Sequence, residues 1–244
     1  MNADQKIARR AAARLGLVTH DDVRKAGISA RSWQRRVAQG VWVRVAPLVY
    51  ASPMAPRTFE QLVRAHVLSA GRGAAVSHRS AAFLHGFDGF GAERVVHISV
   101  PDVRRLAPRS GAIVHSREDL TTADITAVRT LRVTTPIRTI IDLASCATER
   151  ELENAVDSAV RNRQLTIALL QLRLAELRDS GWAGVRTLDR VLDVLPKGEL
   201  HTRLERDYLA LSRLVGCPKY PASWCCGKAR SLWPASISPI RHFA

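Results

Sequence analysis

Three helix-forming patterns and an alternating apolar segment follow one another within the first fifty residues, and this order leaves few folds open. The first pattern predicts a helix over residues 4–15, with Ile7, Ala11 and Leu15 on one face. In the second, "VTHDDVRKAG", Thr19 is placed to cap the helix, and the aspartate three residues later completes a capping box of the acidic kind. The glycine that closes this segment favours the end of the helix.

The third pattern and the alternating segment complete a compact unit. Ser29 is placed to cap a helix over residues 30–39, whose Trp33 and Val37 are four residues apart and face inward. The segment "VWVRVAPLVYA" alternates with a period of two on either side of Pro47, which predicts a short β-hairpin. Three helices and a hairpin in this order are typical of a winged helix-turn-helix domain, which the sequence places at residues 1–53.

The charge of the chain favours a polyanionic partner. The sequence has 37 Lys and Arg residues against 22 Asp and Glu residues, for a net charge of +15, and its first fifty residues hold ten basic and three acidic side chains. Double-stranded DNA is therefore the expected partner. The third helix would enter the major groove, and the side chains that face the bases would be Arg31, Ser32, Gln34 and Arg35. Two further arginines, Arg36 and the wing residue Arg44, would contact phosphates. The alternative is a solvated basic face on a purely structural unit.

Several classes of protein are disfavoured by composition. The start of the chain, "MNADQKIARR", has no apolar leader segment, and no run of 18 apolar residues exists, so a cytoplasmic protein without a membrane partner is expected. The four cysteines, Cys146, Cys217, Cys225 and Cys226, lack zinc-site spacing and are expected to be reduced thiols. No His/Cys/Asp cluster at metal spacing occurs in residues 1–216, so neither a metal nor another cofactor is predicted.

The middle of the chain mixes helical and strand patterns. An amphipathic helix is predicted at residues 58–70, followed by two strands at 94–100 and 111–117. A helix that begins at a proline is predicted at 136–145, and three further helices at 150–163, 166–178 and 184–195. The expected fold class is α+β: an N-terminal winged helix-turn-helix followed by a mixed α/β and helix-rich domain at residues 54–196.

Two pairs of polar residues in this middle region are interpreted structurally. His97 and His115 lie on apolar strands and are expected to pack within a sheet instead of binding a metal. Arg138 and Asp142 are four residues apart in "PIRTIID", which predicts an ion pair along one helix face. A contact to another domain or to a partner is the alternative for the second pair.

The stretch "AAVSHRSAAFLHGFDG" could be an active site or a helix start. Ser77 and His78 are adjacent, so neither a strand nor a helix gives them an obvious mutual hydrogen bond, and no G-x-S-x-G turn surrounds a serine. The structural interpretation is that Ser77 or Ser80 caps a helix that ends at Gly86, and no catalytic residue is predicted. Arg79 lies near the positive end of this helix, so it needs a carboxylate, a phosphate or a partner protein.

Four segments together resemble a known family. "GVWVRVAPLVYA", "AAVSHRSAAFLHGF", "VVHISVP" and "VTTPIRTIIDLA" are similar to AbiEi-type antitoxins and related regulators, over about residues 5–195. The resemblance implies a winged helix that binds DNA at the promoter of its own operon. It also implies a C-terminal part that opposes a nucleotidyltransferase-like toxin without a stable complex. Leu48 stands where the wing turn of relatives has a glycine, which predicts a less tight hairpin tip.

A second resemblance concerns the segment "GELHTRLERDYLALSRLVGCP". It looks like the first helix of a DUF559-like domain, similar to very-short-patch-repair endonucleases, with Glu205 at the place of an early glutamate. Such nucleases hold a divalent metal with further carboxylates, but no Asp or Glu follows Asp207, so hydrolysis by that route is excluded. We therefore expect a truncated remnant at residues 197–216 and an irregular tail at 217–244, either disordered or the product of a lost reading frame.

These observations predict a non-enzymatic, DNA-binding transcriptional regulator, an AbiEi-like antitoxin that represses its own operon. Two alternatives to this prediction stay open. The first is a DUF559-type endonuclease relative that has lost its catalytic carboxylates. The second is an interaction protein whose winged helix binds another protein.

Overall fold

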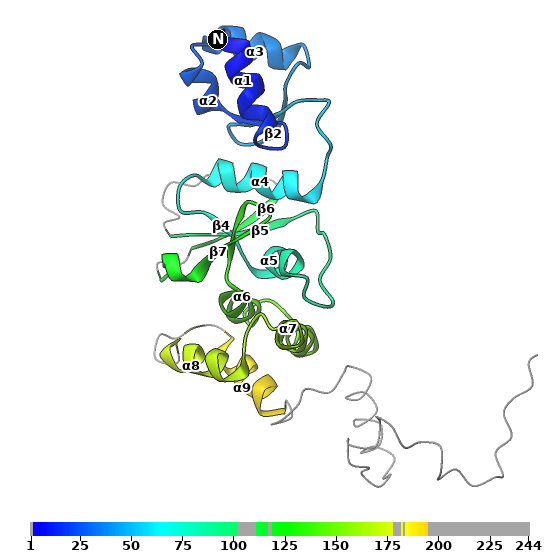
Figure 1. Cartoon of the computed structure of the whole chain (residues 1–244), viewed down its shortest axis with the longest axis vertical. Coiled ribbons are helices and arrows are strands. Elements are labelled where there is room, and N and C mark those ends of the chain that lie inside the picture. The colour runs from blue at the N-terminus through cyan, green and yellow to red at the C-terminus, as the bar shows by residue number, and fades with distance from the viewer. Residues whose placement is uncertain (1, 102–110, 117–118, 178–181, 183, 195–244) are drawn as a thin grey trace, which may run out of the picture. The chain divides into compact units, whose positions relative to one another are not determined.

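The structure, a computed structural model, describes residues 2–101, 111–116, 119–177, 182 and 184–194. The described residues lie in one compact unit, and Figure 1 labels many of its helices and strands. The predicted remnant at 197–216 and the predicted tail at 217–244 lie outside the described residues. The fold class is α+β, as predicted.

The N-terminal elements agree closely with the sequence patterns. They are α1 (Ala3–Ala12), β1 (Leu17–Thr19), α2 (His20–Lys25), α3 (Ala30–Ala38), β2 (Val43–Ala46) and β3 (Val49–Ala51). The predicted caps are confirmed: Thr19 Oγ1 accepts from the Asp22 N–H at 3.1 Å, and Ser29 Oγ accepts from the Ser32 N–H at 3.3 Å. The short strand β1 was not predicted; it joins the hairpin in an antiparallel sheet of order β1-β3-β2.

Two expectations about this region are wrong. The first helix ends at Ala12, and Leu15 lies beyond it in a left-handed conformation with φ of 54° and 37% exposure, so it is not part of the inward face. The hairpin tip is tight despite its missing glycine. Pro47 and Leu48 alone connect the paired residues Ala46 and Val49, and Leu48 itself adopts a positive φ of 59°.

An aromatic group holds α3 against the hairpin. Trp33 of α3 is 2% exposed, and its ring lies 5.5 Å from that of Trp42 and 5.2 Å from that of Tyr50, which it meets edge to face. Ile7 and Val23 close the same cluster from α1 and α2. The orientation of α3 relative to β2 and β3 is therefore fixed by buried aromatic area.

Helix α4 (Phe59–Ala70) packs on both sheets. Ala65 and Leu68 contact the cluster formed by Leu17 and Val49 under the three-stranded sheet, whereas Val63 lies in the core of the second sheet. An apolar surface on more than one side is what a buried helix requires. Helix α4 therefore joins the two sheets.

The second sheet is mixed and has five strands. These are β4 (Ala75–Val76), β5 (Val96–Val100), β6 (Ala112–Ser116), β7 (Ile125–Val128) and β8 (Leu131–Thr134), in the order β6-β5-β4-β8-β7. The pairs β5–β6 and β4–β8 are parallel, and the other two are antiparallel. Helix α4 covers one face, and α5 (His78–His85) and α6 (Pro136–Leu143) cover the other (Figure 1).

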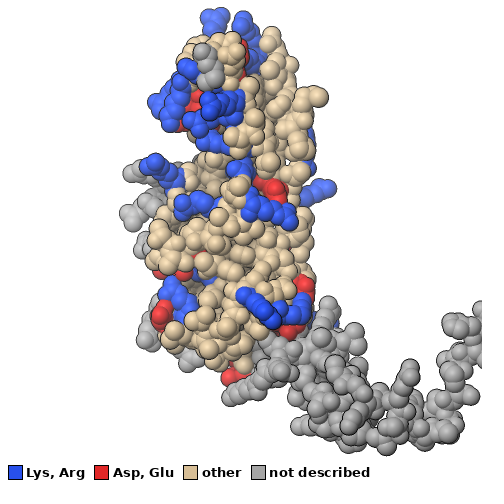
Figure 2. Space-filling view, viewed as in Figure 1, with Lys and Arg blue, Asp and Glu red and all other residues tan. Residues whose placement is uncertain are grey.

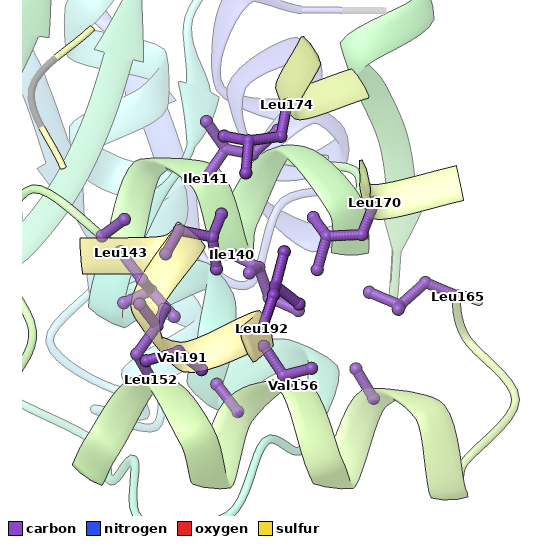
Figure 3. Packing of buried hydrophobic residues seen from close by; sticks show 14 of the residues in the cluster. Ile140, Ile141, Leu143, Leu152, Val156, Leu165, Leu170, Leu174, Val191 and Leu192 are labelled. Atoms are coloured by element: carbon purple, nitrogen blue, oxygen red, sulfur yellow. The ribbon is translucent and has the colours of Figure 1, made fainter. Parts of the chain in front are cut away.

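A separate core lies among the last helices. Helices α7 (Glu149–Arg161), α8 (Ile167–Leu177) and α9 (Val185–Val194) agree with the three predicted helical segments to within two residues at each end. Their leucine, isoleucine and valine side chains converge with those of α6 (Figure 3). Among the described residues, no helix has the length and apolarity needed to cross a membrane.

Candidate nucleic-acid interface

The predicted base-reading helix presents polar side chains to solvent. Arg31, Gln34 and Arg35 of α3 are exposed, whereas Trp33 between them is buried. Ser32 is half-buried, and its backbone N–H is bonded to the cap residue Ser29. Figure 2 shows that Lys and Arg side chains gather over the N-terminal elements α1 to α3, with few acidic side chains among them. The arrangement can therefore present two arginines and an amide to a polyanion.

The two predicted phosphate contacts differ in their surroundings. Arg44 is exposed on β2, directly opposite Tyr50 of β3, so its side chain stands on the wing. Arg36 is 27% exposed, and its guanidinium forms an ion pair with Asp4 of α1. Arg36 thus links α1 to α3, and a phosphate would have to compete with Asp4 for it.

Further basic residues, which the sequence reading missed, lie on α1 and α2. Lys6, Arg9, Arg10 and Lys25 line a surface hollow together with Asp22. Asp22 accepts from Arg14 Nη1 at 2.8 Å and from the backbone N–H of Thr19 in the α2 cap, so one carboxylate serves both an arginine and the cap. The signal was present as the three-to-four-residue spacing of basic side chains on the polar face of α1. The basic surface of the N-terminal elements is therefore wider than α3 and the wing.

Arg79 has carboxylate partners within the chain. Its Nε donates to Glu93 Oε1 at 2.7 Å, its Nη2 donates to Glu151 Oε1 at 2.8 Å, and its guanidinium lies 5.2 Å from the centre of the Phe90 ring. The hydrogen bond from Arg79 lowers the pKa of Glu151 to about 2, aided by the backbone N–H of Thr148. Of the partners that the sequence left open for Arg79, the structure supplies two carboxylates: Glu151 ties α5 to the start of α7, and Glu93 ties it to the segment before β5.

The serine and histidine at the start of α5 depart from the prediction. Ser77 Oγ lies 2.9 Å from His78 Nδ1, although the sequence indicated no such bond, and Ser77 makes no side-chain cap. Ser80 Oγ instead accepts from the backbone N–H of His97 at 2.9 Å, so it does not cap the helix either. His78 has a left-handed φ of 50°, so the regular strand or helix geometry on which the expectation for adjacent residues was based does not apply here. Both Ser77 and His78 are 0% exposed, so a substrate cannot reach this pair from solvent.

The fold also brings three histidines together. The sequence indicated no metal-site spacing and assigned His97 and His115 to sheet packing alone, yet His78, His97 and His115 each offer a ligand atom within 4.8 Å of the others. Sequence spacing cannot show this cluster, because it depends on the register of two parallel strands and on the start of a helix.

The predicted pair of Arg138 and Asp142 is confirmed, but it is buried instead of lying on a surface. Arg138 Nε donates to Asp142 Oδ1 at 3.0 Å, and the side chains are 1% and 0% exposed. Arg138 Nη1 also donates to Asp119 at 3.0 Å and to Asp124 at 3.3 Å. Its guanidinium lies 4.6 Å from the centre of the Trp182 ring. This network joins α6 to the segment before β7, so its role is structural.

Comparisons with known proteins found matches to a family model and among solved structures. The family model for the AbiEi antitoxin C-terminal domain matches residues 74–195, which begin at β4 and extend through α9. Among solved structures, the RV2827C protein from Mycobacterium tuberculosis has a TM-score of 0.49 and 18% sequence identity, with 82% of each chain covered. No curated protein matches the chain.

Proposed function

Because the chain belongs to the family of the AbiEi antitoxin C-terminal domain, we propose that it is an antitoxin and transcriptional regulator whose N-terminal residues 1–53 bind DNA. The matching domain is described as an antitoxin and not as an enzyme. The observation that carries the DNA-binding part is the exposed polar face of α3, which stands on a buried aromatic base beside a β-hairpin. The charge of this region supports it.

The proposed mode of binding is that of a winged helix. Helix α3 enters the major groove, where Arg31, Gln34 and Arg35 contact base edges, since arginine pairs with guanine and glutamine with adenine in a bidentate way. Ser32 lies closer to the cap and makes a secondary contact. Arg44 on the wing contacts phosphates. Arg36 also contacts a phosphate, which replaces Asp4 as the partner of its guanidinium. Bound at the operator of its own operon, the chain would block transcription sterically.

Family membership implies a toxin partner in a toxin–antitoxin system. We propose that this toxin resembles a nucleotidyltransferase and that the chain opposes it without a stable complex. Co-expression should then suppress the growth defect caused by the toxin, while the two purified proteins elute separately in gel filtration. A stable complex, or growth arrest that continues despite co-expression, would contradict this proposal.

Single arginine variants of α3 test the DNA-binding proposal. Arg31→Ala and Arg35→Ala should each weaken binding to the operator by about 1–3 kcal/mol, or roughly 5- to 150-fold, where the arginine is bidentate to a guanine. Fluorescence anisotropy with labelled operator DNA measures this effect. Arg132→Ala is the matched control, because Arg132 is an exposed arginine on β8, away from α3. Unchanged affinity in both α3 variants would refute the assignment.

A further inference from the structure

Three imidazoles from distant parts of the sequence meet between α5 and the second sheet. His78 is the first residue of α5, His97 lies on β5 and His115 lies on β6. In the parallel pairing of β5 with β6, His115 is opposite Ser99, two residues beyond His97. Because side chains alternate along a strand, His97 and His115 project from the same face. That face is covered by α5, which supplies the third ring.

The distances between the rings suit a shared ligand. His97 Nδ1 lies 3.1 Å from His115 Nε2. Two nitrogens bound to one tetrahedral zinc ion at the usual bond lengths would lie about 3.3 Å apart. The potential ligand atoms of all three rings lie within 4.8 Å of one another. His78 stacks on His115 with 3.5 Å between ring centres, so the His78 ring must turn about its side-chain bonds to direct a nitrogen at the same ion as His115.

The surroundings hold these rings in place. Ser77 Oγ lies 2.9 Å from His78 Nδ1. A hydrogen bond to the far side of a ligand ring is typical of metal sites, since it orients the imidazole. Ser80 Oγ accepts from the backbone N–H of His97, which ties the backbone of β5 to α5. His78 also keeps a left-handed φ of 50°, a conformation that costs free energy in a non-glycine residue and is concentrated at functional sites.

The cluster is largely closed off from solvent. His78 is 0% and His97 6% exposed, so the ring nitrogens of these two histidines are shielded from bulk water.

We propose that His78, His97 and His115 together bind one divalent transition-metal ion, with zinc as the first candidate. Three imidazole nitrogens suit zinc, and also cobalt, nickel and copper, better than they suit magnesium or calcium. A three-histidine set leaves a fourth position for water or for another ligand. The ion would clamp the start of α5 to β5 and β6. This proposal does not depend on DNA binding.

Metal binding is measured on the full chain purified without a polyhistidine tag. After zinc loading and dialysis, the protein should retain one zinc per chain, and Co²⁺ should give a visible spectrum of nitrogen ligation. At a hundredfold excess of zinc over Kd, the unfolding midpoint should rise by roughly 5–10 °C. The double variant His97→Gln with His115→Gln should lose the retained metal and the rise in midpoint. His20→Gln is the matched control, because His20 is exposed at the start of α2.

Several outcomes would overturn the proposal. Absence of saturable binding to the unmodified chain is one, and unchanged metal content in the double variant is another. Thiolate-to-cobalt charge-transfer bands would assign the ion to cysteines instead. If circular dichroism shows that the double variant is unfolded, the single variant His115→Gln replaces it, since His115 is only half-buried; retention of metal in this folded variant with unchanged affinity would likewise refute the site.

Discussion

Arg138 is enclosed almost completely by the fold, and its replacement by methionine tests what holds the second half of the unit together. The guanidinium forms ion pairs with Asp142 and Asp124, whose side chains are 0% and 8% exposed, and with Asp119, whose side chain is 41% exposed. Methionine keeps much of the length of arginine but removes the charge. The substitution therefore leaves the packing nearly filled while both buried carboxylates lose this cation.

The expected cost is estimated from these partners. Breaking a buried ion pair by removing one partner costs about 3–5 kcal/mol, because the remaining charge stays buried. Asp119 adds little, since it can be solvated. Asp124 keeps a hydrogen bond from Arg173 at 3.3 Å, so its part of the penalty is reduced. We therefore expect Arg138→Met to lower the free energy of unfolding by about 3 kcal/mol, at the lower end of that range.

Urea denaturation followed by circular dichroism measures this loss. Arg132→Met, at an exposed position six residues earlier, is the control and should change stability by less than about 0.5 kcal/mol. The double variant Arg138→Met with Asp142→Leu should recover part of the loss, because it also removes the buried carboxylate whose charge Arg138 balanced. A loss below about 1 kcal/mol for Arg138→Met, or no recovery in the double variant, would refute the reasoning.

Three further perturbations have defined outcomes. Because Arg79 lowers the pKa of Glu151 from 4.5 to about 2, this pair stabilises the fold above pH 4.5, and the contribution is lost as the pH falls toward 2. Unfolding measured at pH 7 and pH 3 should show a smaller acid loss for Glu151→Gln; an equal loss would contradict the pair. Trp33→Ala should cost about 3–5 kcal/mol in urea unfolding, since the ring is 2% exposed. Gly184→Ala should lower the melting midpoint, because its Cβ would lie 2.3 Å from a backbone oxygen at the end of α6, whereas Gly91→Ala, which meets nothing within 4 Å, should leave it nearly unchanged.

The helices were largely predictable from local chemistry. Thr19, Ser29 and Pro136 mark helix starts by hydrogen bonds or backbone restrictions that depend only on neighbouring residues. The hairpin of β7 and β8 was not predicted, because the local signal that marks such a turn is absent from its sequence. Its turn residues Arg129 and Thr130 have φ of 47° and 68°, a conformation usually signalled by glycine or asparagine, and no such residue is present.

The polar clusters were less predictable, because they depend on strand register and on helix packing. The sequence indicated a carboxylate as one partner for Arg79, but Glu93 and Glu151 are 14 and 72 residues away. The approach of His97 to His115 requires the parallel pairing of β5 with β6, which no local pattern encodes. Arg138 and Asp142 were predicted as a pair, but their burial follows from the helices that cover them.

Protection of DNA by the chain tests the central claim most directly. In a nuclease footprint on the region upstream of its own gene, the account predicts one protected segment that weakens steeply with salt, as phosphate contacts require. The double variant Arg31→Ala with Arg35→Ala should lose this protection at concentrations where Arg132→Ala retains it. Equal protection of unrelated DNA, or a footprint that the double variant leaves intact, would contradict sequence-selective binding through α3.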